Sequence, residues 1–247
     1  MLEVRGLSLD FGKSALLEKA SFRLGTGEFG VIIGLSGCGK TSLFRALAGL
    51  LPYREGRIAW KGRPVKNLAG LAAFMQQKDL LLPWATLEEN ALLPARISGQ
   101  AGPRERQRAL ELLHRFGLKG FERALPRQVS GGMRQRCALA RTILSEREIV
   151  LLDEPLSSLD ALTRAGLQRE LLRLQAEFGK SVLMVTHDVE EALLLADRVF
   201  ILRGAPAAIE EILEVSDPKP RDTDLPLVVK NRRVLRAALE GGAPHVA

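Results

Sequence analysis

The chain has 247 residues, of which 46% are hydrophobic and 26% are charged, so it can bury a sizeable core and is not an intrinsically disordered protein. Its formal net charge of +7 suits a polyanionic partner such as a nucleotide, a nucleic acid or an anionic membrane surface, although mixed acidic and basic residues favour a solvated surface for most of these charges. No run approaches the roughly 18 apolar residues of a membrane span, and neither cysteine has a metal-binding spacing, so we expect a cytoplasmic protein that reaches any membrane through a partner.

The first third of the chain has the pattern of short strands followed by a helix. Short apolar or β-branched runs bounded by glycine are typical of strands. Strands are therefore expected over residues 2–9, 20–24 and 29–33. The composition becomes helical from residue 41, and the helix is expected to stop at Gly49 or Pro52.

The middle of the chain, residues 78–145, has a different composition. Leu and Arg are abundant there, and four prolines interrupt the pattern. One helix is expected over residues 104–116, because Leu110, Leu113 and Phe116 recur at helical spacing. This segment therefore predicts a helical lobe inserted into an α/β domain.

Strands and helices alternate in the last third. Strands are expected over residues 148–152, 181–186 and 199–202. The apolar spacing of residues 167–178 predicts an amphipathic helix that ends at Gly179, and a short helix is expected over 228–239. Alternation of strand and helix predicts a largely parallel sheet, with ligand chemistry at the ends of its strands.

The segment GLSGCGKT lies between an expected strand and an expected helix and fits the pattern GxxxxGK[ST]. Glycines let the backbone wrap closely around phosphates, and the helix N-terminus offers a positive end to the anion. Lys40 is expected to reach the β- and γ-phosphates, and the hydroxyl of Thr41 is expected to bind Mg²⁺. The nucleotide-binding candidates here are Gly34, Ser36, Gly37, Cys38, Gly39, Lys40, Thr41 and Ser42.

Two adjacent carboxylates, Asp153 and Glu154, follow the apolar strand expected at 148–152. Successive strand residues point in opposite directions, so the pair can divide the work. Asp153 is expected to hold Mg²⁺, directly or through water, and Glu154 to polarise the attacking water. Phosphoryl transfer needs mainly positioning and charge neutralisation, so downstream of a phosphate loop this interpretation is favoured over a solvated turn.

A second turn suited to anions consists of Ser130, Gly131 and Gly132, followed by a helical run. It again offers a hydroxyl, flexible glycines and a helix N-terminus. The alternative is an ordinary helix cap in which Ser130 satisfies free N–H groups.

Together these motifs resemble the ATP-binding cassette (ABC) ATPase family. Residues 34–41 resemble its Walker A loop, residues 149–154 its Walker B strand with the catalytic glutamate, and the segment VSGGMRQRCALAR its signature motif and helix. Asp160 in SSLD resembles the D-loop aspartate, and His187 in VTHD resembles the switch histidine.

Two further positions match the family's pattern. Gln77 resembles the Q-loop glutamine, and Phe11 lies before Gly34 where the family stacks an aromatic ring on adenine, although Tyr is commoner there. The signature departs from the usual LSGGQ at Val129 and Met133, with its Ser-Gly-Gly core intact.

The resemblance implies a P-loop NTPase core with a mainly parallel sheet, an N-terminal antiparallel β subdomain and an inserted α-helical subdomain. The ATPase domain would span residues 1–215, with the helical subdomain at about 78–145 and a short tail at 216–247. The implied cofactors are ATP and Mg²⁺. Two copies would pair head to tail, with Ser130 and Gly132 contacting the γ-phosphate held by the partner. Gln77 would link Mg²⁺ and the attacking water to the helical lobe, and His187 would hold the γ-phosphate and the water.

The further partners implied are an integral membrane permease and an extracytoplasmic substrate-binding protein, with no nucleic acid, at the cytoplasmic face of the cell membrane. The strings LLLPWATLEEN, SGGMRQR and PKPRD are similar to those of the importer subgroup for nitrate, taurine, sulfonates and related small anions or thiamine precursors.

Other functions stay open at this point. A soluble ABC ATPase of DNA repair usually carries a long coiled-coil insertion, and one of translation usually carries two cassettes; this chain has no such heptad run and one phosphate loop. The motor of an exporter remains possible, because the motor does not touch the cargo. A regulator without catalysis is disfavoured by the intact Glu154.

Overall fold

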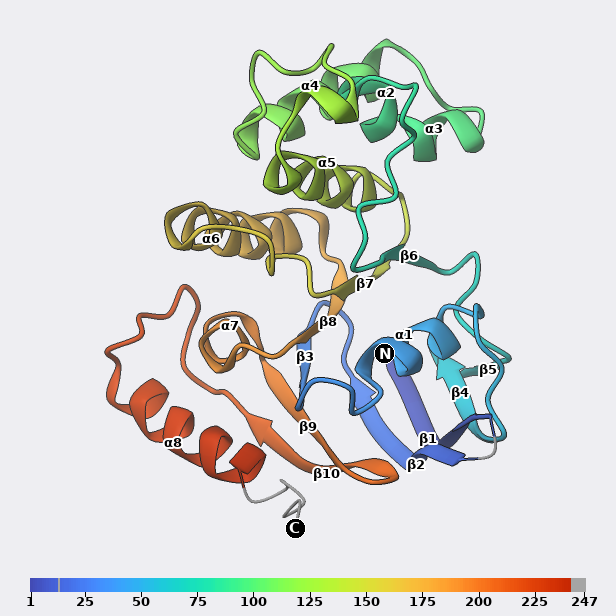
Figure 1. Cartoon of the computed structure of the whole chain (residues 1–247), viewed down its shortest axis with the longest axis vertical. Helices are drawn as coiled ribbons and strands as arrows, with labels where there is room; N and C mark the ends of the chain where they lie inside the picture. Colours follow the sequence, from blue (N-terminus) through green and yellow to red (C-terminus); the bar gives the residue numbers. More distant parts are fainter. Residues whose placement is uncertain (13, 241–247) are drawn as a thin grey trace.

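The computed structural model describes residues 1–12 and 14–240, except for the side chains of Phe11, Glu210 and Glu211. Within this part, ten strands form a single sheet in the order β5-β4-β1-β2-β10-β9-β3-β8-β7-β6 (Figure 1). The strands are β1 (Leu2–Phe11), β2 (Ser14–Leu24), β3 (Phe29–Ile33), β4 (Glu55–Trp60), β5 (Arg63–Val65), β6 (Ala72–Met75), β7 (Ile149–Asp153), β8 (Ser181–Thr186), β9 (Arg198–Gly204) and β10 (Ala207–Glu214). The helices are α1 (Lys40–Leu47), α2 (Leu87–Ala91), α3 (Leu93–Ile97), α4 (Pro103–Arg115), the 3₁₀ turn η1 (Pro126–Gln128), α5 (Gly131–Ile143), α6 (Ala161–Phe178), α7 (Val189–Leu195) and α8 (Pro226–Glu240).

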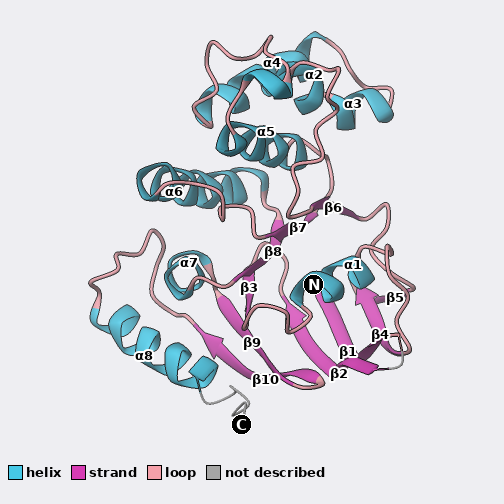
Figure 2. Ribbon diagram, viewed as in Figure 1, coloured by secondary structure: helices cyan, strands magenta, loops and turns pink. Residues whose placement is uncertain are grey.

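The sheet has an antiparallel end and a parallel end (Figure 2). β5, β4, β1 and β2 pair antiparallel, whereas β9, β3, β8, β7 and β6 pair in parallel. β10 joins the two parts, because it pairs antiparallel with β9 and parallel with β2. The predicted fold class, a mainly parallel core with an N-terminal antiparallel part and inserted helices, is confirmed.

The parallel register brings three strand ends to one edge of the sheet. Ile33 of β3 pairs with Thr186 of β8, and Asp153 of β7 pairs with Val185 of β8. The chain therefore leaves β3, β7 and β8 at nearly the same level. Segments that follow these three strands lie next to one another, which is where an open α/β sheet binds its ligands.

Both faces of the parallel strands are buried, as their uninterrupted apolar runs predict. Side chains of a strand alternate between faces. Val31 and Ile33 belong to an apolar cluster that includes Leu171 of α6, whereas Ile32 belongs to a second cluster that includes Phe44 of α1. The sheet is thus covered on both sides by helices.

The helical lobe consists of α2 to α5, inserted between β6 and β7, and lies above the sheet in Figure 1. Ion pairs tie it to α6 of the body: Arg115 on α4 pairs with Glu170 and with Glu177, the latter at 2.9 Å. The buried apolar residues of the lobe are continuous with one of the two clusters of the sheet. Lobe and body therefore share a core.

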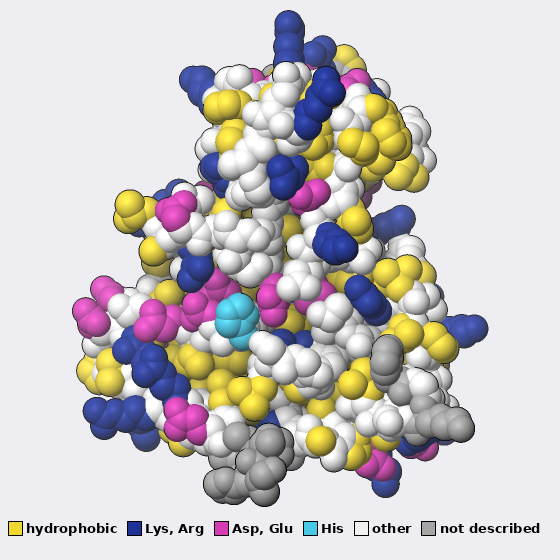
Figure 3. All heavy atoms as spheres, viewed as in Figure 1, with side chains coloured by type: hydrophobic (Ala, Val, Ile, Leu, Met, Phe, Trp, Pro, Cys, Tyr) yellow, Lys and Arg dark blue, Asp and Glu magenta, His cyan; other side chains and the backbone are white. Residues whose placement is uncertain are grey.

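The segment after β10 packs onto the body rather than extending from it. Val228 and Leu235 of α8 are buried in the same cluster as the sheet, and α8 lies next to β9 and β10 in Figure 1. No helix among the described residues is long and apolar enough to cross a membrane. On the face shown in Figure 3, Lys and Arg side chains are scattered among acidic ones over lobe and body alike.

Most expected elements occur close to their expected bounds, and β3 and β8 match them residue for residue. The helix expected to end at Gly179 does so, with that glycine in the left-handed conformation at φ 59°. β2 begins at Ser14 rather than at residue 20, because exposed polar residues in its first half conceal the strand pattern. The expected strands did not include β4, β5, β6 or β10, of which β10 carries several glutamates.

Candidate active site

The loop between β3 and α1 owes its shape to glycine. Gly37 and Gly39 have φ angles of 82° and 102°, in the left-handed region that other residues avoid. A Cβ on Gly34 would lie 2.4 Å from the carbonyl oxygen of Leu202 on β9, so a side chain there would push the loop away from the sheet. These three glycines, all predicted as phosphate-loop residues, allow the tight turn at the start of α1.

Lys40, the first residue of α1, fills the middle of this loop. Its side chain is buried, and Nζ donates hydrogen bonds of 2.8 Å to the carbonyl oxygens of both Gly34 and Leu35. The first turn of α1 contains no acidic residue. The ammonium group and the positive end of the helix therefore reinforce each other, which favours a bound anion.

Thr41 and Asp153 meet beneath the loop. The hydroxyl of Thr41 donates to Oδ1 of Asp153 at 3.2 Å. Asp153 is only 1% exposed, and its Oδ2 has no hydrogen-bond partner among the described residues. Burial raises the pKa of this carboxyl, and the neighbouring Glu154 charge adds to the rise. A buried, unpaired carboxylate oxygen beside a hydroxyl suits a hard divalent cation, so these residues fit Mg²⁺.

Glu154 does not continue the alternation of β7, which corrects the argument from strand geometry. Its φ of 49° places its backbone in the left-handed region, which costs a residue with a side chain on the order of 1–3 kcal/mol. Hydrogen bonds hold this conformation. The N–H of Glu154 donates to Val185 at 3.0 Å, and its carbonyl oxygen accepts from Nε2 of Gln135 and from the hydroxyl of Ser157, both at 3.0 Å.

Two other predicted residues converge on the Glu154 carboxylate. Nε2 of Gln77, just beyond β6, donates to Glu154 Oε2 at 3.4 Å. Nδ1 of His187, just beyond β8, lies 3.5 Å from Glu154 Oε1. Three residues far apart in the sequence are therefore brought together at one carboxylate.

The turn of Ser130, Gly131 and Gly132 lies at the N-terminus of α5. The Ser130 hydroxyl accepts the Met133 N–H at 3.2 Å, so in this structure it caps the helix. Ser130 and Gly131 are exposed, and a Cβ built on Gly132 would lie 3.1 Å from Leu159. The turn thus lies against its own helix and against the segment before α6.

Four other predicted residues belong to the surroundings of the site. Asp160 caps α6 by accepting the Thr163 N–H at 3.0 Å, and this bond holds the pKa of Asp160 below its ordinary value. Ser42 lies in the first turn of α1. Ser36 and Cys38 lie in the phosphate loop, where burial raises the pKa of the Cys38 thiol. The side chain of Phe11 lies outside what the structure describes.

Sequence reasoning did not single out the inward face of α5. Besides Gln135, this face carries Arg134, which donates to Oδ2 of Asp79 at 3.0 Å. Arg141 donates to the carbonyl oxygens of Asp79 at 2.6 Å and Leu80 at 2.8 Å. Positions 134 and 141 are two helical turns apart, so their spacing is the signal that could have indicated a shared face.

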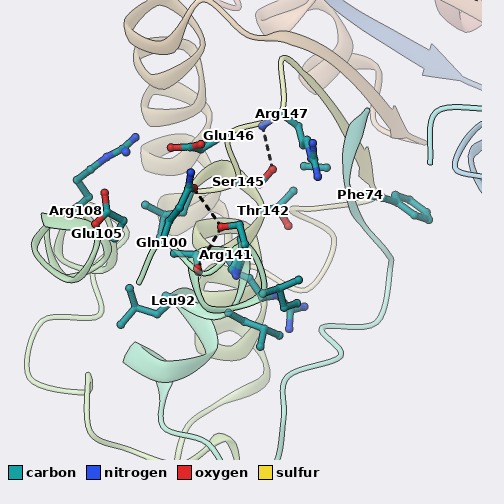
Figure 4. A pocket seen from close by; sticks show the side chains of 18 of the residues that line it. Phe74, Leu92, Gln100, Glu105, Arg108, Arg141, Thr142, Ser145, Glu146 and Arg147 are labelled. Carbon is teal, nitrogen blue, oxygen red and sulfur yellow. Dashed lines mark hydrogen bonds between the residues drawn. The ribbon is translucent and has the colours of Figure 1, made fainter. Parts of the chain in front are cut away.

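A cavity of about 600 Å³ lies between the lobe and strand β6 (Figure 4). Its lining includes β6, α3 and the C-terminal end of α5 with the residues that follow. Both charged and apolar side chains line it, among them Arg108, Glu146 and Ile97, of which Ile97 is 78% exposed.

Comparisons with known proteins agree with this geometry. A family model described as "ABC transporter" matches residues 17–157. The aliphatic sulfonates import ATP-binding protein of Xanthomonas axonopodis pv. citri (strain 306) is 41% identical, over 86% of this chain and 84% of that protein. The taurine import ATP-binding protein of Escherichia coli (strain K12) is 36% identical, over 87% of this chain and 85% of that protein.

Solved structures give the same result. The dimeric ATP-binding cassette MJ0796, in a post-hydrolysis state bound to ADP and Pi, superposes with a TM-score of 0.78 at 28% identity, over 88% of this chain and all of that chain. The phosphate loop, the paired carboxylates and these likenesses lead to one conclusion: the chain belongs to the ABC transporter family, as one of its ATP-hydrolysing subunits.

Proposed function

We propose that this subunit powers the import of a small organic anion of the sulfonate or taurine kind, at the cytoplasmic face of a cell membrane. Two of its relatives are named as import ATP-binding proteins for such compounds. Its partners would be a second copy of itself, an integral membrane permease and an extracytoplasmic substrate-binding protein, with no nucleic acid.

The convergence of a buried lysine, a hydroxyl and two carboxylates at one edge of the sheet supports the catalytic roles. Lys40 would bind the β- and γ-phosphates of ATP, with the N–H groups of the phosphate loop around them. Thr41 and Asp153 would hold Mg²⁺, which neutralises phosphate charge when bound. Glu154 would orient and polarise the attacking water, and Gln77 and His187 would hold that water and the carboxylate in place.

The second anion-binding turn would serve the ATP of another copy. Ser130, Gly131 and Gly132 form a turn at a helix N-terminus that has no acidic residue in its first turn, and Ser130 and Gly131 are exposed. This arrangement favours a phosphate supplied from outside the chain. Asp160 would take part in the same interface, and Phe11 would stack on adenine.

The cavity of about 600 Å³ would receive the permease. It lies between the lobe and the edge strand β6, and the exposed Ile97 on its rim offers apolar area to a partner. A partner bound there would be displaced by any rotation of the lobe relative to the sheet.

The replacement Glu154→Gln tests the proposed reaction. We expect ATP affinity to be retained and kcat to fall on the order of 10²-fold or more, because the amide cannot take part in polarising the water. A phosphate-release assay at saturating ATP would measure turnover, and size-exclusion chromatography with ATP should show a trapped dimer. Lys40→Ala is the matched control, since it should lose ATP affinity itself. Unchanged turnover of Glu154→Gln would refute the catalytic assignment.

The transport role is tested by affinity capture of the tagged chain from its native membranes, with mass spectrometry of the proteins that accompany it. A multi-spanning permease is the expected companion, and the ligand of its binding protein should be a sulfonate or a related small anion. Recovery of ribosomal or DNA-repair proteins alone would contradict the proposal.

A further inference from the structure

Helix α5 holds two strained backbone positions on neighbouring segments. Glu154 and Leu80 are two non-glycine residues with left-handed φ angles, of 49° and 46°. Gln135 donates to the carbonyl oxygen of the first, and Arg141 to that of the second. Left-handed residues with side chains persist only where their surroundings hold them, so α5 is part of what fixes both segments.

We propose that Gln135 is a positioning residue for ATP hydrolysis, which fixes the backbone of Glu154 and thereby aims its carboxylate at the attacking water. This inference rests on the proposed catalytic role of Glu154. Gln135 is only 4% exposed, and its amide donates to the Glu154 carbonyl oxygen at 3.0 Å. A rotation of the Glu154 peptide would therefore have to break this bond.

Gln135 differs from the other groups that hold the Glu154 backbone, because it lies in the helical lobe. Val185 is on β8, and Ser157 lies three residues after Glu154 in the segment that leaves β7, so both move with the sheet. Gln135 instead belongs to the inserted lobe. A cavity of about 350 Å³ adjoins it, lined also by Gln77, Gly131 and Ser158, so space for displacement exists on that side.

The same helix begins at the turn of Ser130 to Gly132, and its cap, Ser130, lies only five positions before Gln135. A helix moves as a unit over one or two turns, because its hydrogen bonds link each residue to the fourth one along. A phosphate bound at that turn would thus shift or stabilise the hydrogen bond from Gln135 to Glu154. Gln135 is therefore placed to make hydrolysis at Glu154 depend on the phosphate that the Ser130 to Gly132 turn of the same copy binds.

The test is Gln135→Met, which keeps the length of the side chain and removes the donor. We expect kcat for ATP to fall about tenfold, equivalent to ~1.4 kcal/mol in the barrier, with KM and ATP affinity within about twofold of the wild type. In a Glu154→Gln background the same replacement should lower the residual rate no further, because no carboxylate remains to be aimed. Gln135→Asn, which keeps the amide but is too short to reach, should resemble Gln135→Met and serves if the methionine variant does not fold.

Cys137→Ala is the matched control on the same helix. Cys137 is also buried, and its thiol lies 3.4 Å from the Leu87 carbonyl oxygen of α2. This replacement leaves a small cavity in the lobe, so it should lower Tm while leaving kcat unchanged. An unchanged kcat in both Gln135 variants would overturn the inference, as would an equal loss of kcat in Cys137→Ala. If Glu154→Gln itself keeps turnover, the proposed reaction fails first, and this outcome is separate from either Gln135 result.

Discussion

At the scale of single residues, Lys180 shows how burial changes an ordinary group. It is 8% exposed, and its ammonium donates to the carbonyl oxygens of Ser145 at 2.5 Å and Arg147 at 2.7 Å. Burial, and then the positive charge of Arg108, lower the pKa of Lys180 from 10.5 to about 8. The folded protein therefore releases this proton at a pH at which the unfolded chain still holds it.

The consequence is a stability that rises with pH. Below about pH 8 both states carry the proton, and the folded state bears the full cost of the buried charge. Between that pH and 10.5 the unfolded chain binds more protons, so the free energy of unfolding increases. Relative to Lys180→Met, the wild type should gain on the order of 1–3 kcal/mol from about pH 7 to about pH 10 in urea titrations. Lys119 is exposed, so the free energy of unfolding of Lys119→Met should follow that of the wild type at every pH. If the wild type gained as much stability relative to Lys119→Met as relative to Lys180→Met, the prediction would be contradicted.

At the scale of elements, Asn90 organises the loop that leads into the lobe. This α2 residue is fully buried, and its amide donates to the carbonyl oxygens of Leu82, Ala85 and Thr86 while its oxygen accepts the Leu82 N–H at 2.7 Å. One side chain thus contacts four backbone groups of an irregular segment, of which the Leu82 and Thr86 carbonyl oxygens also accept backbone N–H groups.

Asn90→Ala should therefore lower the free energy of unfolding by roughly 2–4 kcal/mol, because it leaves buried backbone groups without partners. Urea denaturation followed by circular dichroism would measure this loss, and proteolysis should become faster at the loop. Gln107→Ala is the control, since that exposed amide makes a single surface bond to Glu111. Equal losses in the free energy of unfolding for the two replacements would show that the Asn90 hydrogen bonds add nothing to stability.

Elements with a strong apolar pattern could be predicted from the sequence, and those held by long-range contacts could not. β3 and β8 are fully buried runs, so their bounds follow from composition. α2 has only five residues and depends on Asn90 and on its cap, Thr86, which no periodicity reveals. In the site, Lys40 was predictable because its motif is local, whereas the link from Gln135 to Glu154 spans 19 positions and needs the fold.

At the scale of the whole molecule, Arg221 anchors the C-terminal segment. Arg221 is 8% exposed, and its guanidinium donates to the carbonyl oxygens of Leu193, Ala196, Val215 and Asp217. Burial lowers the pKa of Arg221 below its ordinary value. These four acceptors lie on three segments, the end of α7, the end of β10 and the segment itself. The path of the chain from the sheet to α8 is thereby fixed.

Arg221→Met should cost roughly 2–4 kcal/mol in the free energy of unfolding, since several buried carbonyl groups would lose their donor. Hydrogen exchange should also become faster in α8, which this anchor holds against the body. Arg236→Met, at an exposed position of α8, should change stability by less than about 0.5 kcal/mol. Protection of α8 that survives in Arg221→Met would exclude the anchoring role.

The insertion of the lobe between β6 and β7 has a mechanical consequence. The chain passes between lobe and body at two places only, after Met75 and before Ile149. Lys40, Asp153 and His187 all adjoin mutually paired strands, so they belong to one rigid frame. These two crossings favour a rotation of the lobe about the line that joins them, and the ion pairs of Arg115 with α6 resist that rotation. The molecule is in this sense a latched hinge, and a pull on the lobe would reach the site of hydrolysis through α5, whose Gln135 holds the Glu154 backbone.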